Sequence, residues 1–307
     1  MTKKPRITIP EEEDLIHHIM LTTELSWKYR ITRANINEWL SNFKGEIFDL
    51  GYERRLALWL LTNFVYYNEN EVRHLCKTLH NDFIHYQILK DYPDFKDVEA
   101  VLTDINKKTL YFALGRSGES GGFISYYFRK ENKLSTKNFV LNPNDIDKDV
   151  KQIVFIDDVT LSSGKSQAIR YLKKDVEDFF PKKRILLLTL IASEKAIKNV
   201  KEKGYEIINC ITLSERNQCF SDSSTVFDIH KTHLKDCENF SLHYGKKLNP
   251  SHPLGHKNAQ LLFGFFYNTP NNSLPIFWAD VNGWKPIIRR YHKNYKETNY
   301  DEIGRFI

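Results

Sequence analysis

The sequence of 307 residues has few cysteines and no long apolar run, and each absence excludes a class of protein. Cys76, Cys210, Cys219 and Cys237 show no Cys-x-x-Cys spacing, so we expect reduced thiols rather than a zinc site or a disulfide framework. No apolar run approaches the roughly 20 residues that a membrane-spanning helix needs. The acidic residues 11–14 stand where a signal peptide would have its apolar core. We therefore expect a cytoplasmic protein that does not bind membranes.

The composition is that of a globular protein, with neither internal repeats nor low-complexity tracts. Hydrophobic residues make up 41% of the chain and charged residues 27%, values typical of folded proteins. The length allows one large core or two smaller ones. The charge is uneven, since residues 1–100 carry 13 Lys and Arg against 16 Asp and Glu although the whole chain carries +6. The excess of positive charge therefore lies after residue 100.

A basic run near the C-terminus contains no acidic residue between Val281 and Lys296. Its cations could attract phosphates or a nucleic acid, and its tyrosines permit base stacking. A solvated basic terminus without a ligand would show the same pattern, so both interpretations stay open. The run consists of Lys285, Arg289, Arg290, Tyr291, Lys293, Tyr295 and Lys296.

A short apolar run that ends in two carboxylates is the most informative segment. Residues 153–156 are apolar, Asp157 and Asp158 follow, and a loop rich in hydroxyl groups leads into a helical pattern at 165–174. In a parallel α/β sheet the tip of such a strand lies where ligands bind, and the next helix presents free N–H groups there. Hydroxyls and N–H donors suit a phosphate, whereas carboxylates suit sugar hydroxyls or a divalent ion. The segment therefore predicts a sugar-phosphate site.

Two other interpretations of this segment remain open. Gly164-Lys165-Ser166 matches the end of a P-loop, but Val159 stands where the P-loop needs its first glycine. Alternatively, the two aspartates only cap the next helix. Two adjacent carboxylates beside four hydroxyl residues favour the ligand site over both.

A second strand-and-loop segment lies upstream of the acid pair. Residues 109–115 have the pattern of an apolar strand, and a glycine-rich loop follows directly. Its glycines allow close approach of the backbone, and its arginine and serines could hold a polyphosphate, although an ordinary turn would look similar. The candidate ligand-binding residues are Arg116, Ser117, Gly118, Ser120 and Gly121.

The segment from Gln152 to Ser166 resembles the signature of the type I phosphoribosyltransferases, in which a strand ends in two acidic residues before a Thr/Ser/Gly loop and a helix. The resemblance implies that Asp157 and Asp158 form the catalytic pair, approach the ribose hydroxyls of phosphoribosyl pyrophosphate and share Mg²⁺ with its pyrophosphate. It also implies that the upstream loop receives the pyrophosphate. The implied 5′-phosphate loop comprises Thr160, Ser162, Ser163, Gly164, Lys165 and Ser166. Five residues, one more than usual, separate the acid pair from Gly164, so we expect a remodelled loop.

The secondary-structure patterns divide the chain into three parts. Residues 1–105 form a predicted N-terminal helical domain, with helix starts at Thr32 and at the capping pair Asn68 and Glu71. Residues 106–280 form a predicted α/β domain with a parallel, phosphoribosyltransferase-like sheet, and 281–307 form a basic extension. We expect strands at 109–115, 137–141, 151–157, 184–191 and 205–213, helices at 164–178 and 193–203, and an irregular flap at 214–256.

The segment from Gly255 to Trp278 suggests an apolar helix, an Asn/Pro-rich turn and a short strand. With the helical front and the acid pair, this ending resembles phosphoribosyltransferase-like proteins of bacterial conflict systems, some found beside retron reverse transcriptases. The resemblance implies an effector of phage defence that binds phosphoribosyl pyrophosphate or a related nucleotide and transfers or removes a ribose-phosphate group. A non-catalytic sensor acting through a partner protein and a nucleic-acid-directed effector remain alternatives.

Overall fold

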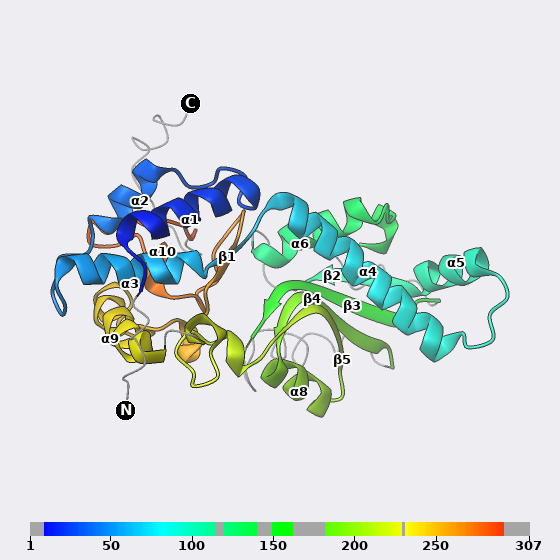
Figure 1. The fold of residues 1–307 in the computed structure, drawn as a ribbon. Helices are drawn as coiled ribbons and strands as arrows, with labels where there is room; N and C mark the ends of the chain where they lie inside the picture. The colour runs from blue at the N-terminus through cyan, green and yellow to red at the C-terminus, as the bar shows by residue number, and fades with distance from the viewer. Residues whose placement is uncertain (1–8, 115–118, 140–148, 162–181, 229–230, 292–307) are drawn as a thin grey trace, which may run out of the picture.

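The computed structural model describes residues 9–114, 119–139, 149–161, 182–228 and 231–291. They form an α/β protein with parallel sheets, as predicted (Figure 1). The predicted domain boundaries at 105 and 280 remain predictions.

The N-terminal part is helical, as the sequence predicts. The helices are α1 (Glu12–Leu25), α2 (Arg33–Leu40), α3 (Leu50–Thr62), α4 (Glu69–Asp91) and α5 (Val98–Lys108), with the short strand β1 (Val65–Tyr67) before α4. Both predicted helix starts are confirmed, because Thr32 and Asn68 each form a capping box with the third helical residue. In each box a side-chain oxygen accepts a backbone N–H that the helix itself leaves unpaired.

The central sheet has four parallel strands in the order β2, β3, β4, β5. They are β2 (Thr109–Ala113), β3 (Gln152–Thr160), β4 (Arg184–Ser193) and β5 (Glu206–Leu213), close to four of the predicted strands. The predicted strand 137–141 is wrong in its described part, where Thr136–Asn138 form a 3₁₀ turn and Phe139 makes an isolated bridge to Tyr111. The Asn138 side chain donates to the carbonyls of Asn106 and Thr109, which holds this segment as a turn.

Helices cover both faces of the central sheet (Figure 1). Successive strand residues point to opposite faces, so Val154 and Ile156 pack in one cluster with α4 and α6 (Ser120–Glu131). Ile153 and Phe155 pack in a second cluster with α8 (Glu194–Glu202), the helix expected at 193–203. The predicted helix 164–178 lies outside the described residues.

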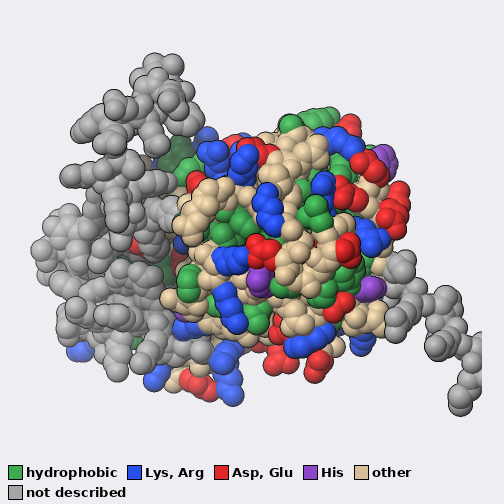
Figure 2. Space-filling model, turned by 90° about the vertical axis from the view of Figure 1, so that its left-hand side faces the viewer, with side chains coloured by type: hydrophobic (Ala, Val, Ile, Leu, Met, Phe, Trp, Pro, Cys, Tyr) green, Lys and Arg blue, Asp and Glu red, His purple; other side chains and the backbone are tan. Residues whose placement is uncertain are grey.

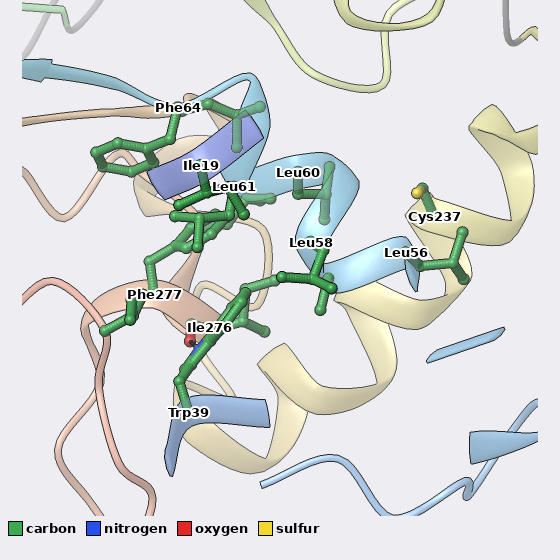
Figure 3. Close-up of a cluster of buried hydrophobic side chains, with 14 of the residues drawn as sticks. Ile19, Trp39, Leu56, Leu58, Leu60, Leu61, Phe64, Cys237, Ile276 and Phe277 are labelled. Atoms are coloured by element: carbon green, nitrogen blue, oxygen red, sulfur yellow. Dashed lines mark hydrogen bonds between the residues drawn. The ribbon is translucent and has the colours of Figure 1, made fainter. Parts of the chain in front are cut away.

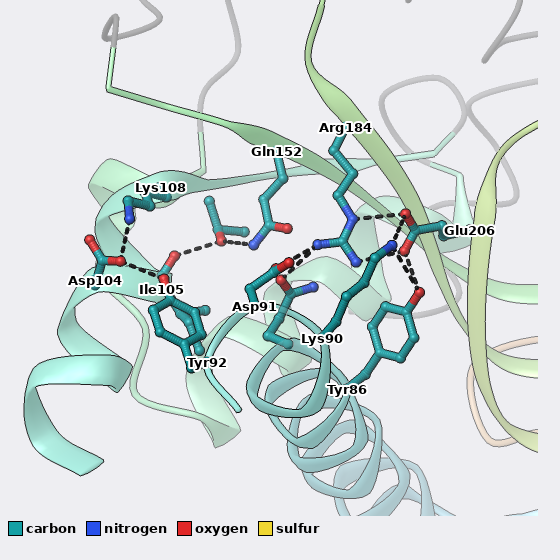
Figure 4. A network of polar contacts seen from close by, with 12 residues as sticks. Tyr86, Lys90, Asp91, Tyr92, Asp104, Ile105, Lys108, Gln152, Arg184 and Glu206 are labelled. Carbon is teal, nitrogen blue, oxygen red and sulfur yellow. Dashed lines mark hydrogen bonds and ion pairs between the residues drawn. The ribbon is translucent and has the colours of Figure 1, made fainter. Parts of the chain in front are cut away.

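The amino ends of β4 and β5 are tied to α4 by a polar network (Figure 4). Arg184 donates two hydrogen bonds to Glu206, 2.8 and 2.7 Å long, and a third to Asp91 at 2.8 Å. Tyr86 and Lys90 on α4 also donate to Glu206. The network fixes the register between α4 and the sheet at the end opposite to the acid pair.

Two predictions about the C-terminal half are wrong. The expected irregular flap 214–256 contains α9 (Lys231–Leu248), which buries Cys237, Phe240 and Tyr244 at helical spacing. The expected helix and strand of 255–278 occur in the opposite order, as strand β6 (Phe263–Phe265) and then helix α10 (Pro275–Trp278). β6 pairs in parallel with β1, and Pro275 at the first helical position starts α10.

The largest hydrophobic cluster joins the two ends of the described chain (Figure 3). α1, α2 and α3 contribute Ile19, Trp39 and Leu60, and the C-terminal half contributes Phe277 from α10. The Trp39 ring stacks on Phe277 with centroids 5.6 Å apart, and its Nε1 donates to the carbonyl of Ile276. Residues 281–291, the described start of the expected basic extension, also pack here through Ile287 and Ile288.

The surface of this helical part carries both signs of charge. Figure 2 shows acidic and basic side chains intermingled on the face turned toward the viewer. Within the described ranges, every helix is too short or too polar to cross a bilayer.

Candidate functional site

The two carboxylates predicted to bind a ligand lie near the carboxyl end of β3. The strand continues beyond the predicted end at residue 157 and reaches Thr160. The two aspartates therefore lie within the paired part of β3 rather than after its end. Asp157 pairs with Thr189 of β4, and Asp158 is 9% exposed. Alternation along the strand points the two side chains to opposite faces, with Asp158 following Val154 and Ile156 toward α6.

Asp158 is held by hydroxyl groups from two distant segments. Ser120 at the start of α6 donates to Oδ1 at 3.0 Å, and Tyr267 after β6 donates to Oδ2 at 3.0 Å. The backbone N–H of Val159 also donates to Oδ1 at 2.9 Å. Because an ionised carboxylate has about four acceptor positions, the group is oriented and still has capacity for a ligand hydroxyl.

Within the described residues, Asp157 accepts fewer hydrogen bonds than Asp158. Its Oδ1 accepts the backbone N–H of Asp158 at 3.0 Å. Burial raises the pKa of Asp157 well above its usual range, and the negative charge of Asp158 raises it further. The pair is therefore a place where a cation, or a donor group of a ligand, would be stabilised.

The start of α6 is fixed against the end of β2 by a glycine. A Cβ built on Gly121 would lie 2.0 Å from the carbonyl oxygen of Leu114, whereas one on Gly122 would meet nothing within 4 Å. Leu114 itself continues the pairing with β3, since its N–H donates to the carbonyl of Ile156 at 2.8 Å. Gly121 thus lets Ser120 come close enough to bond Asp158, and the chain's own packing requires it.

Tyr267 and Arg290 belong to this site, although the sequence did not single them out as site residues. Burial raises the pKa of Tyr267 well above its usual range, and Asp158 raises it further, so Tyr267 stays a neutral donor. Burial lowers the pKa of Arg290, whereas the charge of Asp158 opposes that shift. The Arg290 guanidinium donates to the carbonyl of Thr269 and lies 5.5 Å from the ring centroid of Trp278.

A weak signal for both residues was present in the sequence. Arg290 stood in the basic run, and Tyr267 preceded the Asn/Pro-rich turn. The turn connects them, because Oδ1 of Asn268 accepts the N–H groups of Thr269 and Tyr291. Only the fold shows that Tyr267 bonds Asp158 and that the charge of Asp158 acts on Arg290.

Comparison with known proteins identifies the family. The family model PRTase-CE matches residues 36–290. This chain belongs to the PRTase-CE family. The family is phosphoribosyltransferase-like and associated with conflict systems, as the resemblance indicated. No curated protein and no solved structure matches the chain.

The PRTase-CE match includes all the contacts described around Asp158, since it extends through Tyr267 to Arg290. Of the predicted site residues, the structure brings together Asp157, Asp158 and Ser120. Thr160 is buried at the end of β3, and its hydroxyl donates to Oγ1 of Thr189 at 3.4 Å within the sheet. Gly121 packs against the Leu114 carbonyl rather than against a ligand space. The remaining predicted residues lie outside the described residues: Arg116, Ser117, Gly118, Ser162, Ser163, Gly164, Lys165 and Ser166.

Within the described ranges of this PRTase-CE protein, no cluster of three or more His, Cys, Asp or Glu could by itself hold a metal ion. The four cysteines are free thiols. Burial raises the pKa of Cys76 and of Cys210 to about 12, which makes them unreactive near neutral pH.

Proposed function

We propose that this protein is an effector of antiviral defence that binds phosphoribosyl pyrophosphate or a related nucleotide at Asp157 and Asp158. The observation that carries the proposal is the orientation of Asp158 by Ser120 and Tyr267 at the carboxyl end of β3. Membership of a phosphoribosyltransferase-like family supports the assignment of the ligand class. In this proposal the carboxylates accept hydrogen bonds from the ribose hydroxyls.

The proposed reaction is the transfer or removal of the ribose-phosphate group. The bond between ribose and pyrophosphate, or between ribose and base, breaks, and an acceptor or water bonds to the ribose carbon in its place. The residues proposed to hold the phosphates are Ser120 and the predicted loop residues beyond the described ranges, and the buried Thr160 would anchor the start of that loop to the sheet rather than contact a phosphate. Asp158 and Tyr267 would orient the ribose, and the positive charge of Arg290 would offset part of the charge of the acid pair.

Mg²⁺ is the proposed cofactor, and the acid pair fits it. Burial and the neighbouring Asp158 raise the pKa of Asp157, so a divalent ion beside the pair would relieve the repulsion between the carboxylates. Asp157 or Asp158 would supply oxygen ligands, which Mg²⁺ prefers, and the pyrophosphate would supply others. The ion would neutralise charge on the leaving pyrophosphate.

Product analysis separates an enzyme from a sensor. The protein is incubated with Mg²⁺ and phosphoribosyl pyrophosphate, then with a panel of nucleotides, and released pyrophosphate and ribose phosphate are measured. We expect release by the wild-type protein and none by Asp158→Asn. Binding without turnover of any substrate, in a protein that still acts against phage, would overturn the enzymatic proposal in favour of a sensor that works through a partner.

The basic run gives less support to a nucleic-acid-directed effector. Lys285 pairs with Glu38 at 3.2 Å, and the Arg290 side chain turns toward Trp278 and Thr269. Arg289 is exposed, and Lys293 and Lys296 lie outside the described residues. The two engaged cations are therefore less available to a phosphate backbone than the sequence suggested.

A further inference from the structure

A cavity at the start of α4 carries features of a second ligand site. It has a volume of about 290 Å³ and is lined by residues from the end of α1, from β1, from the start of α4 and from the segment after β6. Its volume is near the small end of the range for ligand sites, about 300–1,000 Å³, so it suits one small ligand rather than a polymer. The lining residues used below are Trp27, Lys28, Arg30, Tyr66, Glu69 and Phe266.

One wall of the cavity is aromatic. The rings of Trp27 and Tyr66 lie 6.0 Å apart, and both residues are buried. Phe266 continues this wall toward α6, where it packs against Phe123 at 5.7 Å between ring centroids. Flat aromatic surfaces suit a planar ring, because every nucleobase has a face that can stack on such a side chain.

The lining also includes the N-terminus of α4, a helix of 23 residues. The capping box uses the N–H groups of Asn68 and Glu71. Among the residues that the structure describes, the N–H groups of Glu69 and Asn70 have no hydrogen-bond partner. The free donors and the helix dipole favour an anion at this position.

Unpartnered polar groups on buried side chains also face this cavity. Tyr66 is 5% exposed and Trp27 3% exposed, and neither the Tyr66 hydroxyl nor Nε1 of Trp27 has a hydrogen-bond partner within the described ranges. Because both side chains line the cavity, a ligand in it could accept hydrogen bonds from these two donor groups. This observation is independent of the helix N-terminus.

Two cations stand at the rim. Lys28 and Arg30 are exposed. Burial raises the pKa of Tyr66, and the positive charge of Arg30 opposes this rise, so Arg30 lies close enough to act on the Tyr66 hydroxyl. The turn that presents them is held by a hydrogen bond from Asn68 to the carbonyl of Ser26 at 2.8 Å. Glu69 is the acidic residue of the lining, and its carboxylate accepts from Tyr127 on α6 at 3.1 Å.

We propose that this cavity binds a nucleoside monophosphate. The base lies against the wall of Trp27, Tyr66 and Phe266, and the phosphate lies between the start of α4 and Arg30. The ligand needs both an anion and a planar ring, because the cavity offers free donors and cations as well as aromatic rings. Phe266 directly precedes Tyr267, the donor to Asp158, but the residues that line the cavity include neither Tyr267 nor the acid pair.

Isothermal titration with the four ribonucleoside 5′-monophosphates, adenosine and inorganic phosphate tests the proposal. We expect at least one monophosphate to bind, and adenosine and phosphate to bind at least about tenfold more weakly, since each lacks one half of the contacts. Arg30→Ala and Tyr66→Phe should each weaken monophosphate binding about tenfold or more. Arg30 is exposed and Tyr66→Phe removes one oxygen, so both variants should fold.

Two control variants are matched to Arg30→Ala and Tyr66→Phe. Arg216→Ala removes an exposed arginine elsewhere, and Tyr111→Phe removes a buried, unpartnered hydroxyl from the central sheet. Both should bind like wild type. Failure of all four monophosphates, equal binding of phosphate alone, or unchanged binding in the Arg30 and Tyr66 variants would overturn the proposal. Loss of monophosphate binding in Asp158→Asn would also overturn it, because the nucleotide would then sit at the acid pair.

Discussion

Asp157 and Asp158 are adjacent in sequence, but they differ in their hydrogen bonds. Asp158 accepts hydrogen bonds from two side-chain hydroxyls, each of which stabilises a carboxylate. Asp157 is held near that charge, and burial adds to the penalty on its own ionisation. A residue pair arranged in this way stores unfavourable electrostatic energy that a ligand or ion can release, and such pairs are common at functional sites.

The first prediction is that Asp157→Asn stabilises the free protein at neutral pH by about 1 kcal/mol. A group whose folded-state pKa is raised contributes stability at low pH and loses it as pH rises through the folded pKa. The stability of wild type relative to Asp157→Asn should therefore fall as pH rises above about 4, the ordinary aspartate pKa. Chemical denaturation across the pH range measures this difference.

Asp158→Asn is the matched comparison for that prediction. It removes the charge that accepts from Ser120 and Tyr267, so we expect a loss of about 1–2 kcal/mol in the free energy of unfolding. If Asp157→Asn proves less stable than wild type at neutral pH, the described electrostatic difference between the two aspartates is wrong.

The second prediction concerns two adjacent glycines of α6. Gly121→Ala places a Cβ against the Leu114 carbonyl, where 2.0 Å is far inside contact distance, so we expect a loss of about 3 kcal/mol or more. Gly122→Ala meets open space, and alanine's helix preference should stabilise by about 0.5–1 kcal/mol. Thermal and urea unfolding of both variants provide the comparison. Equal effects of the two substitutions would show that α6 does not begin against β2 in this way.

At the scale of elements, the polar network at the amino ends of β4 and β5 holds α4 on the sheet (Figure 4). Burial alone would raise the pKa of Glu206, but hydrogen bonds from Arg184, Tyr86 and Lys90 outweigh it and lower that pKa to about 2. Because its folded pKa is lowered, Glu206 contributes stability above its ordinary pKa of 4.5, and this contribution is lost as pH falls through about 2.

The third prediction follows from that network. Glu206→Gln should lower the free energy of unfolding by about 2 kcal/mol at neutral pH, because it leaves Arg184 without its bidentate partner. The difference from wild type should shrink as pH falls from 4.5 toward 2. The control is Glu202→Gln, whose exposed pair with Lys198 is 3.9 Å long and should change stability by less than about 0.5 kcal/mol. A pH-independent difference would contradict the assignment.

The sequence predicts the central elements well and the C-terminal half poorly, for identifiable reasons. The strands around 109–115 and 151–157 are buried apolar runs, and Asn68 with Glu71 is a local capping signal, so neighbours in sequence suffice. α9 was missed because its exposed face is polar, although Cys237, Phe240 and Tyr244 recur at helical spacing. The apolar run before Asn268 suits a short buried strand as well as a helix, and pairing with β1 decides between them.

At the scale of the whole molecule, the site depends on contacts between segments that are distant in sequence. Ser120, Asp158 and Tyr267 come from the start of α6, the end of β3 and the segment after β6. Sequence reasoning identified the acid pair and Ser120, because each lies in a local strand-and-loop pattern. It could not place Tyr267 or Arg290, since no local pattern records which distant strand end a turn will face.

The hydrophobic cluster that joins the two ends of the described chain explains how Tyr267 is held near Asp158. α1 to α3 share a hydrophobic cluster with α9 and α10 (Figure 3), and the adjoining β1–β6 pair leads directly to Tyr267. Asp158, near the carboxyl end of β3 in the central sheet, is therefore bonded to the segment that follows β6. Disturbing this cluster should change the position of Tyr267 even without a change near Asp158.

The most direct test of the proposed function is the affinity for phosphoribosyl pyrophosphate in the presence of Mg²⁺, measured by isothermal titration for wild type, Asp158→Asn and Asp222→Asn. Asp222 is exposed and remote in sequence from the described contacts of the acid pair, so its variant should bind like wild type. Asp158→Asn should bind about ten- to hundredfold more weakly, because a hydrogen bond to a charged group contributes about 1.5–3 kcal/mol. No binding by wild type, or equal binding by a folded Asp158→Asn variant, would contradict the account.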